Sequence, residues 1–223
     1  MKTPAPVEGV DTRDMLVVHA ALRREFGLAP GLVRGVADGD VARARIVGRH
    51  VRLLLDLLHV HHGGEDRLLW PLLLVRVPAQ LAPVIELMER QHRQIEATIE
   101  VIDPVLDRWA AGSATDEGVV LAAALDDLST ALDEHLLTEE ERMLPLAAAH
   151  LSPAEWGRLA EEVKKLPIRV LPVAFGMLLH KGDPEVVEVI LAQVPALPRL
   201  VLPRLAPRAY ARHARRVHGT ATP

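Results

Sequence analysis

One short pattern that occurs twice constrains what this chain can fold into more than any other feature of its sequence. The two copies are His61-x-x-x-Glu65 and His135-x-x-x-Glu139, and in both a proline follows the glutamate after six residues. Side chains four residues apart on a helix lie on one face, about 5–6 Å apart between Cβ atoms. Each copy sits inside a strongly apolar helical pattern, so each pair is placed to hold a metal ion in the interior of a helical fold.

Apolar residues follow the helical period over four long stretches joined by short turns. This pattern predicts an all-α fold, an up-down antiparallel four-helix bundle. The expected helices cover about 11–37, 41–75, 81–111 and 116–150. Gly27 and Pro30 are expected to interrupt or kink the first. Gly63-Gly64 and Pro71 predict a local loosening or kink of the second beside its histidines, where the backbone approaches a metal or a neighbouring helix. Glycine costs roughly 1 kcal/mol and proline about 3 kcal/mol inside a helix.

Residues 151–223 form a second region after the bundle, which occupies residues 11–150. Ser152-Pro153-Ala154-Glu155 has the composition of a capping box with proline at the first helical position. Short helices are expected at about 153–165, 168–180, 184–193 and 195–217. Their apolar runs need a surface to cover, so we expect this extension to pack on the bundle or to form a homodimer interface.

The composition excludes several classes of protein. Hydrophobic residues make up 49% of the chain but aromatic residues only 3%, which favours helices packed through aliphatic side chains. The absence of cysteine excludes disulfides and thiolate metal ligands. A net charge of −4 gives no case for a nucleic-acid partner, and the arginines near the end of the chain are interpreted as a solvated helix face. No apolar run reaches the roughly 18 residues that cross a bilayer, so no membrane partner is predicted, and without a secretory signal a cytoplasmic location is expected.

Two further histidines complete the pattern. His19 precedes His61 by 42 residues and His92 precedes His135 by 43, so each half of the bundle offers one histidine and one His-x-x-x-Glu pair. Six side chains then converge from four helices with approximate two-fold symmetry, as in a dinuclear metal site. Imidazole and carboxylate ligands suit Fe, Mn, Zn or Cu better than Mg or Ca. The predicted ligands are His19, His61, Glu65, His92, His135 and Glu139.

Several neighbouring residues compete with these six or support them. His62 could also meet Glu65, but the repeat favours His61, since His135 likewise precedes its glutamate by four residues. Asp66 and Glu140 follow the chosen carboxylates by one residue and are weaker candidates. His59 and His50 are interpreted as supporting or packing residues, and Trp70 as a core residue or a wall of the site. The remaining histidines are expected at the surface: His150, His180, His213 and His218.

These residues resemble the hemerythrin-like, or HHE cation-binding, family over about residues 11–150. The resemblance rests on His19, on His61-x-x-x-Glu65 with the following Leu-Leu-Trp-Pro, on His92 within Gln-His-Arg-Gln-Ile-Glu, and on His135-x-x-x-Glu139 followed by Met-Leu-Pro. It implies a four-helix bundle with two iron ions in an oxo- or hydroxo-bridged non-heme centre, Mn or Zn being the alternatives. The tail looks like an extension found in larger actinobacterial-type members.

The resemblance implies a protein that binds or reacts with O2, peroxide or NO. Oxygen-carrying members have a second histidine one turn after the one in the third helix, where this chain has Glu96. Three roles are open to Glu96: a carboxylate ligand of the metal, an acceptor of a hydrogen bond from a bound ligand, or a solvated side chain. Reversible O2 carriage is therefore not predicted. A metal-dependent redox or oxygen sensor without turnover is the alternative, and a metallohydrolase that activates water is a weaker one.

Overall fold

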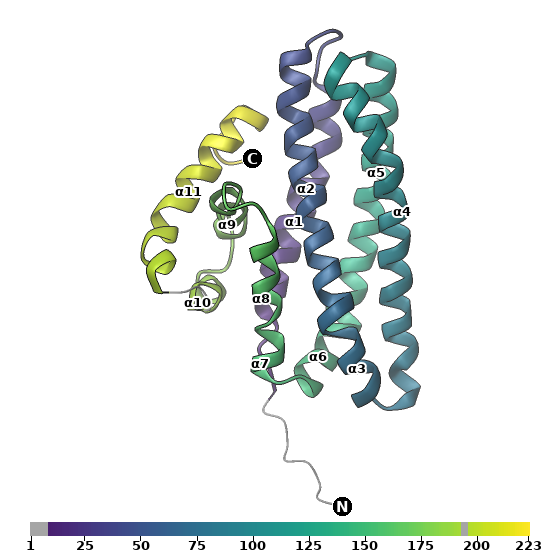
Figure 1. Cartoon of the computed structure of the whole chain (residues 1–223), viewed down its shortest axis with the longest axis vertical. Helices are drawn as coiled ribbons and strands as arrows, with labels where there is room; N and C mark the ends of the chain where they lie inside the picture. The colour runs from purple at the N-terminus through teal and green to yellow at the C-terminus, as the bar shows by residue number, and fades with distance from the viewer. Residues whose placement is uncertain (1–8, 193–195) are drawn as a thin grey trace, which may run out of the picture.

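Four long helices form the body of the computed structural model, which describes residues 9–192 and 196–223 (Figure 1). They are α1 (Arg13–Arg34), α2 (Val41–Leu68), α4 (Ala82–Gly112) and α5 (Thr115–Thr138). Each packs against the long helix before it and after it in the chain, and α5 closes the ring on α1. The predicted all-α, up-down antiparallel bundle is confirmed, and no strand occurs within the described ranges.

The first helix runs through the two residues that were expected to break it. α1 continues past Gly27 and Pro30 as far as Arg34, so the prediction of an interruption was wrong. Phe26, Pro30 and Val33 are buried against the bundle. This packing outweighs the roughly 3 kcal/mol that proline costs in an isolated helix.

The second predicted helix does break, but at a different place from the glycines. α2 passes through Gly63-Gly64 without interruption and ends at Leu68, and α3 (Trp70–Arg76) follows with Pro71 in its first turn. The single-turn 3-10 helix η1 (Ala79–Leu81) leads into α4. A Cβ on Gly64 would lie 3.1 Å from Cγ of Glu162. Gly64 therefore serves the close approach of another helix and does not loosen the chain.

The fourth predicted helix contains a π-helical turn. α5 leads directly into η2 (Glu139–Met143), which has π geometry, and then into α6 (Leu144–His150). Pro145, in the first turn of α6, has no N–H to donate and would clash with the carbonyl four residues earlier in a regular α-helix. The wider turn removes this conflict, and π turns of this kind occur frequently at functional sites.

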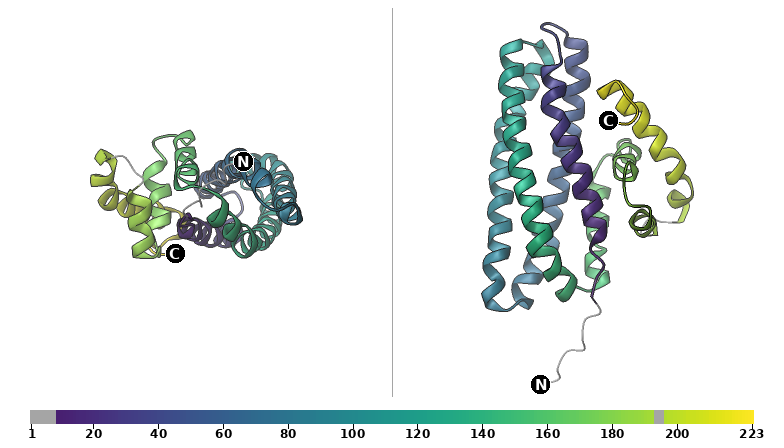
Figure 2. Two further views of the ribbon diagram at one scale, coloured as in Figure 1. Left: turned by 90° about the horizontal axis from the view of Figure 1, so that it is seen from below. Right: turned by 180° about the vertical axis from the view of Figure 1, so that it is seen from behind.

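The extension after the bundle is a series of shorter helices. They are α7 (Pro153–Trp156), α8 (Leu159–Glu162), η3 (Val163–Lys165), α9 (Leu171–Leu179), α10 (Pro184–Ala192) and α11 (Ala196–His218). The predicted capping box at Ser152 and Glu155 is present. The expected start of the last helix at residue 195 lies outside the described residues. α8 contacts α2 and α9 contacts α1, so the extension lies along that side of the bundle, away from α4 and α5 (Figure 2).

Two apolar cores fill the bundle, and a polar layer lies between them. On α1, Met15 belongs to the smaller core and Leu22 to the larger. Along the second helix the order is reversed, with Leu58 of α2 in the larger core and Leu69, the residue between α2 and α3, in the smaller. All the predicted ligands occupy the positions between the two cores. Among the described residues, no helix is both long and apolar enough to cross a membrane.

Candidate metal centre

The polar layer is built from every long helix of the bundle. His19 comes from α1, His92 from α4 and His135 from α5, while α2 and the π-helical turn supply the remaining members. Glu65 and Glu139 are both completely buried. A charged carboxylate in such a place requires compensation by nearby cations or polar groups, so the surroundings of these two glutamates define the chemistry of the layer.

One cluster of donor atoms joins both carboxylates to two imidazoles. Each member offers one ligand atom, and these atoms all lie within 4.8 Å of one another. The members are His19, His61, Glu65 and Glu139. Nε2 of His19 lies 3.3 Å from Oε2 of Glu139. Nδ1 of His61 lies 3.5 Å from Oε1 of Glu65. Two nitrogen and two carboxylate donors at this separation match the ligand set of a single transition-metal ion.

A second cluster consists of three imidazoles, His62, His92 and His135, again within 4.8 Å of one another. Nε2 of His92 lies 3.1 Å from Nε2 of His135, and the ring of His62 stacks on that of His92 at 4.0 Å between centroids. The carboxylates of the first cluster reach the second. Oε2 of Glu65 lies 3.5 Å from Nε2 of His92, and Oε2 of Glu139 lies 3.7 Å from Nε2 of His135. The layer therefore contains two adjoining groups of donor atoms, each able to hold a metal ion, with the two carboxylates between them.

The outer nitrogens of three histidines are held by polar neighbours. Nδ1 of His19 lies 2.9 Å from a carboxylate oxygen of Glu140, and Nδ1 of His92 lies 2.8 Å from one of Asp66. Nδ1 of His135 lies 3.2 Å from the amide oxygen of Gln91. Because each of these oxygens accepts the Nδ1 proton, each Nε2 is left with a lone pair directed into the layer. Asp66 and Glu140 thus orient histidines and lie outside the two clusters.

Burial keeps most of these imidazoles neutral. It lowers the pKa of His61 and of His135 to about 3, and it lowers the pKa of His62 well below its ordinary value. Burial also lowers the pKa of His19, but the carboxylates of Glu139 and Glu140 outweigh it and raise that pKa overall. Burial and the nearby Glu139 raise the pKa of Glu65. Neutral imidazoles are the form that binds metals.

Several buried polar atoms of the layer lack hydrogen bonds within the described part of the chain. They are Nε2 of His19, His61 and His62 and both carboxylate oxygens of Glu65 and Glu139. A buried polar group left in this state costs roughly 1–3 kcal/mol, and more when it is charged. Metal ions would satisfy all these atoms together, so the donor set fits a pair of metal cations.

The six predicted residues all lie in this layer, and His62 joins them. The repeat favoured His61 over His62, whereas the structure places both in the layer, one in each cluster. The helical period of α2 indicates that His62 is buried, which the comparison of the two repeats did not reveal. The buried stripe of α2 runs Leu58, His62, Glu65 at intervals of four and three residues, and His61 stands at its edge.

Two other residues that drew attention in the sequence lie differently. Glu96 faces away from the layer and pairs with His59 at 3.6 Å between Oε2 and Nδ1, where both side chains are exposed. Trp70 is completely buried, with its ring 5.9 Å from that of His92. It therefore packs in the smaller core and also lines the layer.

Some histidines that were expected at the surface are not there. The side chain of His218 is only 5% exposed, and Nε2 of His213 lies 3.0 Å from Nδ1 of His50. The ring of His180 packs 5.1 Å from that of Tyr210. The expectation was wrong because these contacts join residues far apart in the sequence, which spacing within one helix cannot reveal.

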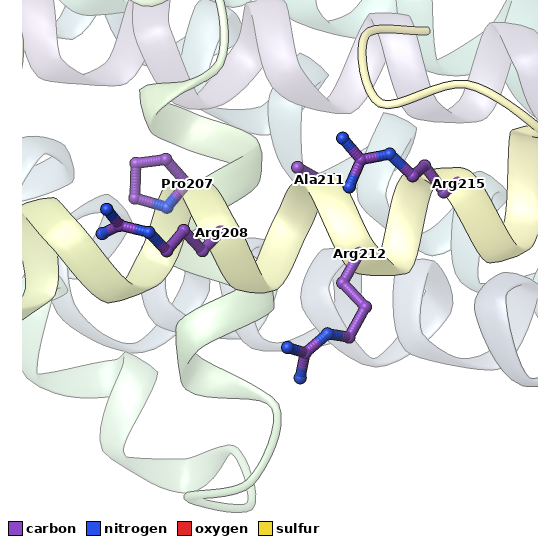
Figure 3. Close-up of a pocket in the computed structure, with 5 residues that line it drawn as sticks. All are labelled: Pro207, Arg208, Ala211, Arg212 and Arg215. Atoms are coloured by element: carbon purple, nitrogen blue, oxygen red, sulfur yellow. The ribbon is translucent and has the colours of Figure 1, made fainter.

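A shallow hollow on the outer face of α11 is unrelated to the layer. Figure 3 shows its lining residues, Pro207, Arg208, Ala211, Arg212 and Arg215. None of them is a histidine or a carboxylate, and the three arginines are exposed, as expected for a solvated helix face.

Comparison with known proteins yields one match. A family model described as the hemerythrin HHE cation binding domain matches residues 10–147. These residues include all of both clusters. No curated protein and no solved structure matches the chain.

Proposed function

Because this chain belongs to the hemerythrin HHE cation-binding domain family, we propose that its polar layer holds two iron ions that bind or react with O2, peroxide or NO. The family match covers more than half of the chain and itself implies cation binding. The observation that carries the finer proposal is the pair of adjoining clusters, seven donor residues with two carboxylates between them. Manganese or zinc is the alternative occupant, since the same ligand types bind both.

The residues of each cluster have separate tasks in this proposal. His19 and His61 would hold one ion, and His62, His92 and His135 the other. Glu65 and Glu139 lie within 3.7 Å of histidines from both clusters and would be shared between the ions. Iron held there would supply electrons to, or accept them from, a small bound molecule.

The surroundings of the layer favour a small ligand. The two apolar cores exclude water from both sides, and Trp70 lies against His92. Asp66 and Glu140 fix the orientation of the histidines, so the ligand atoms are positioned before metal arrives. A buried, preorganised and apolar-walled site suits a diatomic molecule or peroxide better than a bulky substrate.

Metal analysis of aerobically purified protein tests the proposal. We expect about two irons per chain, with near-ultraviolet absorption that disappears on reduction. His62→Gln should lower the iron content, because it removes one of three donors in the second cluster, whereas His59→Gln should leave it unchanged. His59 is the matched control, since it lies on the same helix with its side chain 69% exposed. Stoichiometric zinc without iron would contradict the proposal.

A sensor without turnover is the second candidate, and one contact favours it. α8 packs against Gly64, the residue next to Glu65, so a change at the metal centre has a direct path to the extension. Limited proteolysis of the extension would distinguish the two functions. A sensor should show different cleavage with the metal oxidised, reduced and absent, and identical cleavage in all three states would exclude it.

A further inference from the structure

A second group of buried ligand-type residues lies outside the polar layer, where α11 meets the bundle. Glu25 comes from α1, His50 from α2 and His218 from the last turn of α11. One donor atom from each lies within 4.8 Å of the others. Glu25 is 1% exposed, His50 is fully buried and His218 is 5% exposed, so water reaches none of them freely. Figure 1 shows α9 between much of α11 and the bundle, while the C-terminal end of α11 approaches α2.

The three donor atoms point at one another without a hydrogen bond. Oε2 of Glu25 lies 3.6 Å from Nε2 of His50 and 3.7 Å from Nε2 of His218. All three atoms are buried and have no hydrogen-bond partner within the described residues. Ligand atoms at about 2.0–2.2 Å from a tetrahedral zinc ion are separated from one another by about 3.4 Å. The observed separations of 3.6 and 3.7 Å are close to this value.

The remaining polar atoms of Glu25 and His50 are already engaged. Oε1 of Glu25 accepts hydrogen bonds from the hydroxyl of Tyr210 at 2.5 Å and from Nε of Arg24 at 3.2 Å. Nδ1 of His50 lies 3.0 Å from Nε2 of His213. These partners fix the carboxylate and the imidazole so that only Oε2 and Nε2 face the centre of the group. Metal sites in proteins have this arrangement, in which outer hydrogen bonds orient the ligands.

The charge states also suit a cation. Burial lowers the pKa of His50 to about 3, so its imidazole is neutral at pH 7. Burial alone would raise the pKa of Glu25, but the neighbouring His218 imidazole and the hydrogen bond from Tyr210 lower it to about 2, so it is a carboxylate. The donor set is thus two imidazoles and one carboxylate, which zinc prefers and calcium and magnesium do not.

We propose that Glu25, His50 and His218 form a mononuclear site for a divalent transition-metal ion, most suitably zinc, that fastens α11 to the bundle. The site uses none of the seven residues of the polar layer, so it is independent of the function proposed for that layer. Three protein donors are the number found at zinc sites where water takes the fourth position. Binding would add to the contact already made by Arg43, whose side chain donates to the carbonyl oxygens of Arg216 and Val217.

Zinc titration of the full-length protein, purified with its own metal content in place, tests this site. Wild type should take up about one additional zinc ion per chain, measured by competition with a chromophoric chelator. His218→Gln should weaken this binding at least 100-fold while leaving the metal content of the polar layer unchanged. His59→Gln, which alters an exposed histidine, should bind zinc as wild type does. Equal zinc affinity in wild type and His218→Gln would overturn the proposal and leave the group as an ion pair.

A second measurement distinguishes the loss of zinc binding from misfolding of a variant. Zinc should slow tryptic cleavage at the exposed arginines of α11 in wild type but not in Glu25→Gln, which keeps the size of the side chain. Circular dichroism should show the same helix content for both proteins. Zinc protection that persists in Glu25→Gln would also overturn the proposal.

Discussion

Glu139 and Glu140 show how two adjacent residues can have different tasks at one histidine. Glu139 lies 3.3 Å from Nε2 of His19, and Glu140 lies 2.9 Å from Nδ1 of the same ring. The first belongs to a cluster of potential metal ligands and the second fixes the orientation of the ring. The sequence distinguished them only by the repeat, in which the residue four after each histidine is the predicted ligand.

Substitution of Glu140 tests this division of tasks. Glu140→Gln should weaken metal binding by about 10–100-fold, the usual effect of losing an outer partner of a ligating histidine. The helix should stay folded, because glutamine has nearly the same size. Glu141→Gln is the matched control, since Glu141 is exposed on the same turn. Equal metal affinity in the two variants would show that Glu140 does not orient His19.

Residue spacing predicted much of the layer but not all of it. The six predicted residues were found from intervals of four, 42 and 43 residues, and all six lie together. His62 was discounted because it has no counterpart in the other half of the bundle. It enters the layer through the buried stripe of α2, and the equivalent position after His135 is Leu136. A sequence repeat identifies ligand positions that both halves of the bundle share, but it does not reveal a position, such as His62, that only one half has.

At the scale of helices, glycines mark where backbones approach closely. Gly176 on α9 faces α11, and a Cβ there would overlap the carbonyl oxygen of Ala206 and Cβ of Tyr210. α9 and α11 cross at this point, and Tyr210 also hydrogen-bonds Glu25 on α1. The crossing therefore helps to determine how the extension meets the bundle.

Substitution at this crossing should loosen the extension. Gly176→Ala should lower the free energy of unfolding by about 1–3 kcal/mol, the usual effect of overpacking a tight contact. Gly31→Ala on α1 is the control, because a Cβ there meets nothing within 4 Å. It should be neutral or stabilising by up to about 1 kcal/mol, since alanine favours the helix. Chemical denaturation of both variants measures the difference, and equal stabilities would show that the crossing tolerates a side chain.

The apolar period predicted the approximate limits of the long helices, but it did not predict the continuity of α1 or the π-helical turn after α5. Gly27 and Pro30 were predicted to interrupt or kink the first helix, but the helix continues through both, because the residues around them are buried against the bundle. The π-helical turn has no distinct sequence pattern, because it depends on how Pro145 is accommodated against the preceding carbonyl groups. Periodicity thus locates long helices, whereas tertiary packing decides where they break.

For the whole molecule, the layer between two cores couples metal binding to folding. Without cations, Glu65 and Glu139 are buried in a layer whose imidazoles are mostly neutral, and burial and the neighbouring Glu139 raise the pKa of Glu65. The unfolded chain has no preformed site, so metal binding stabilises the folded state selectively.

Removal of the metal should therefore lower thermal stability. An ion present at 1,000 times its dissociation constant stabilises the folded state by about 4 kcal/mol per site. For a chain of this size, this corresponds to a shift in Tm of roughly 8–16 °C per site. Differential scanning calorimetry before and after chelation measures the shift, and restoring the metal should reverse it. An unchanged Tm would show that the layer folds independently of metal.

The contact between the extension and the bundle was the part least accessible from the sequence. His218 lies 168 residues after His50, and nothing in the spacing of either residue indicates that they meet. The prediction left open whether the extension packs on the bundle or forms a homodimer interface. α8, α9 and α11 all contact the bundle within one chain, and a homodimer remains a prediction.

The π-helical turn also bears on how related sequences can differ in length. A π turn contains one residue more than the α turn that it replaces. Deleting one residue between Glu139 and Met143 would restore a regular helix and keep His135 and Leu144 in register on either side. If the deleted residue were Glu139 or Glu140, one carboxylate would remain at the layer. Only one of the two contacts to His19 would then be left. Alignments of relatives should therefore place a one-residue gap at this turn, where evolution can change the ligand spacing without rebuilding the bundle.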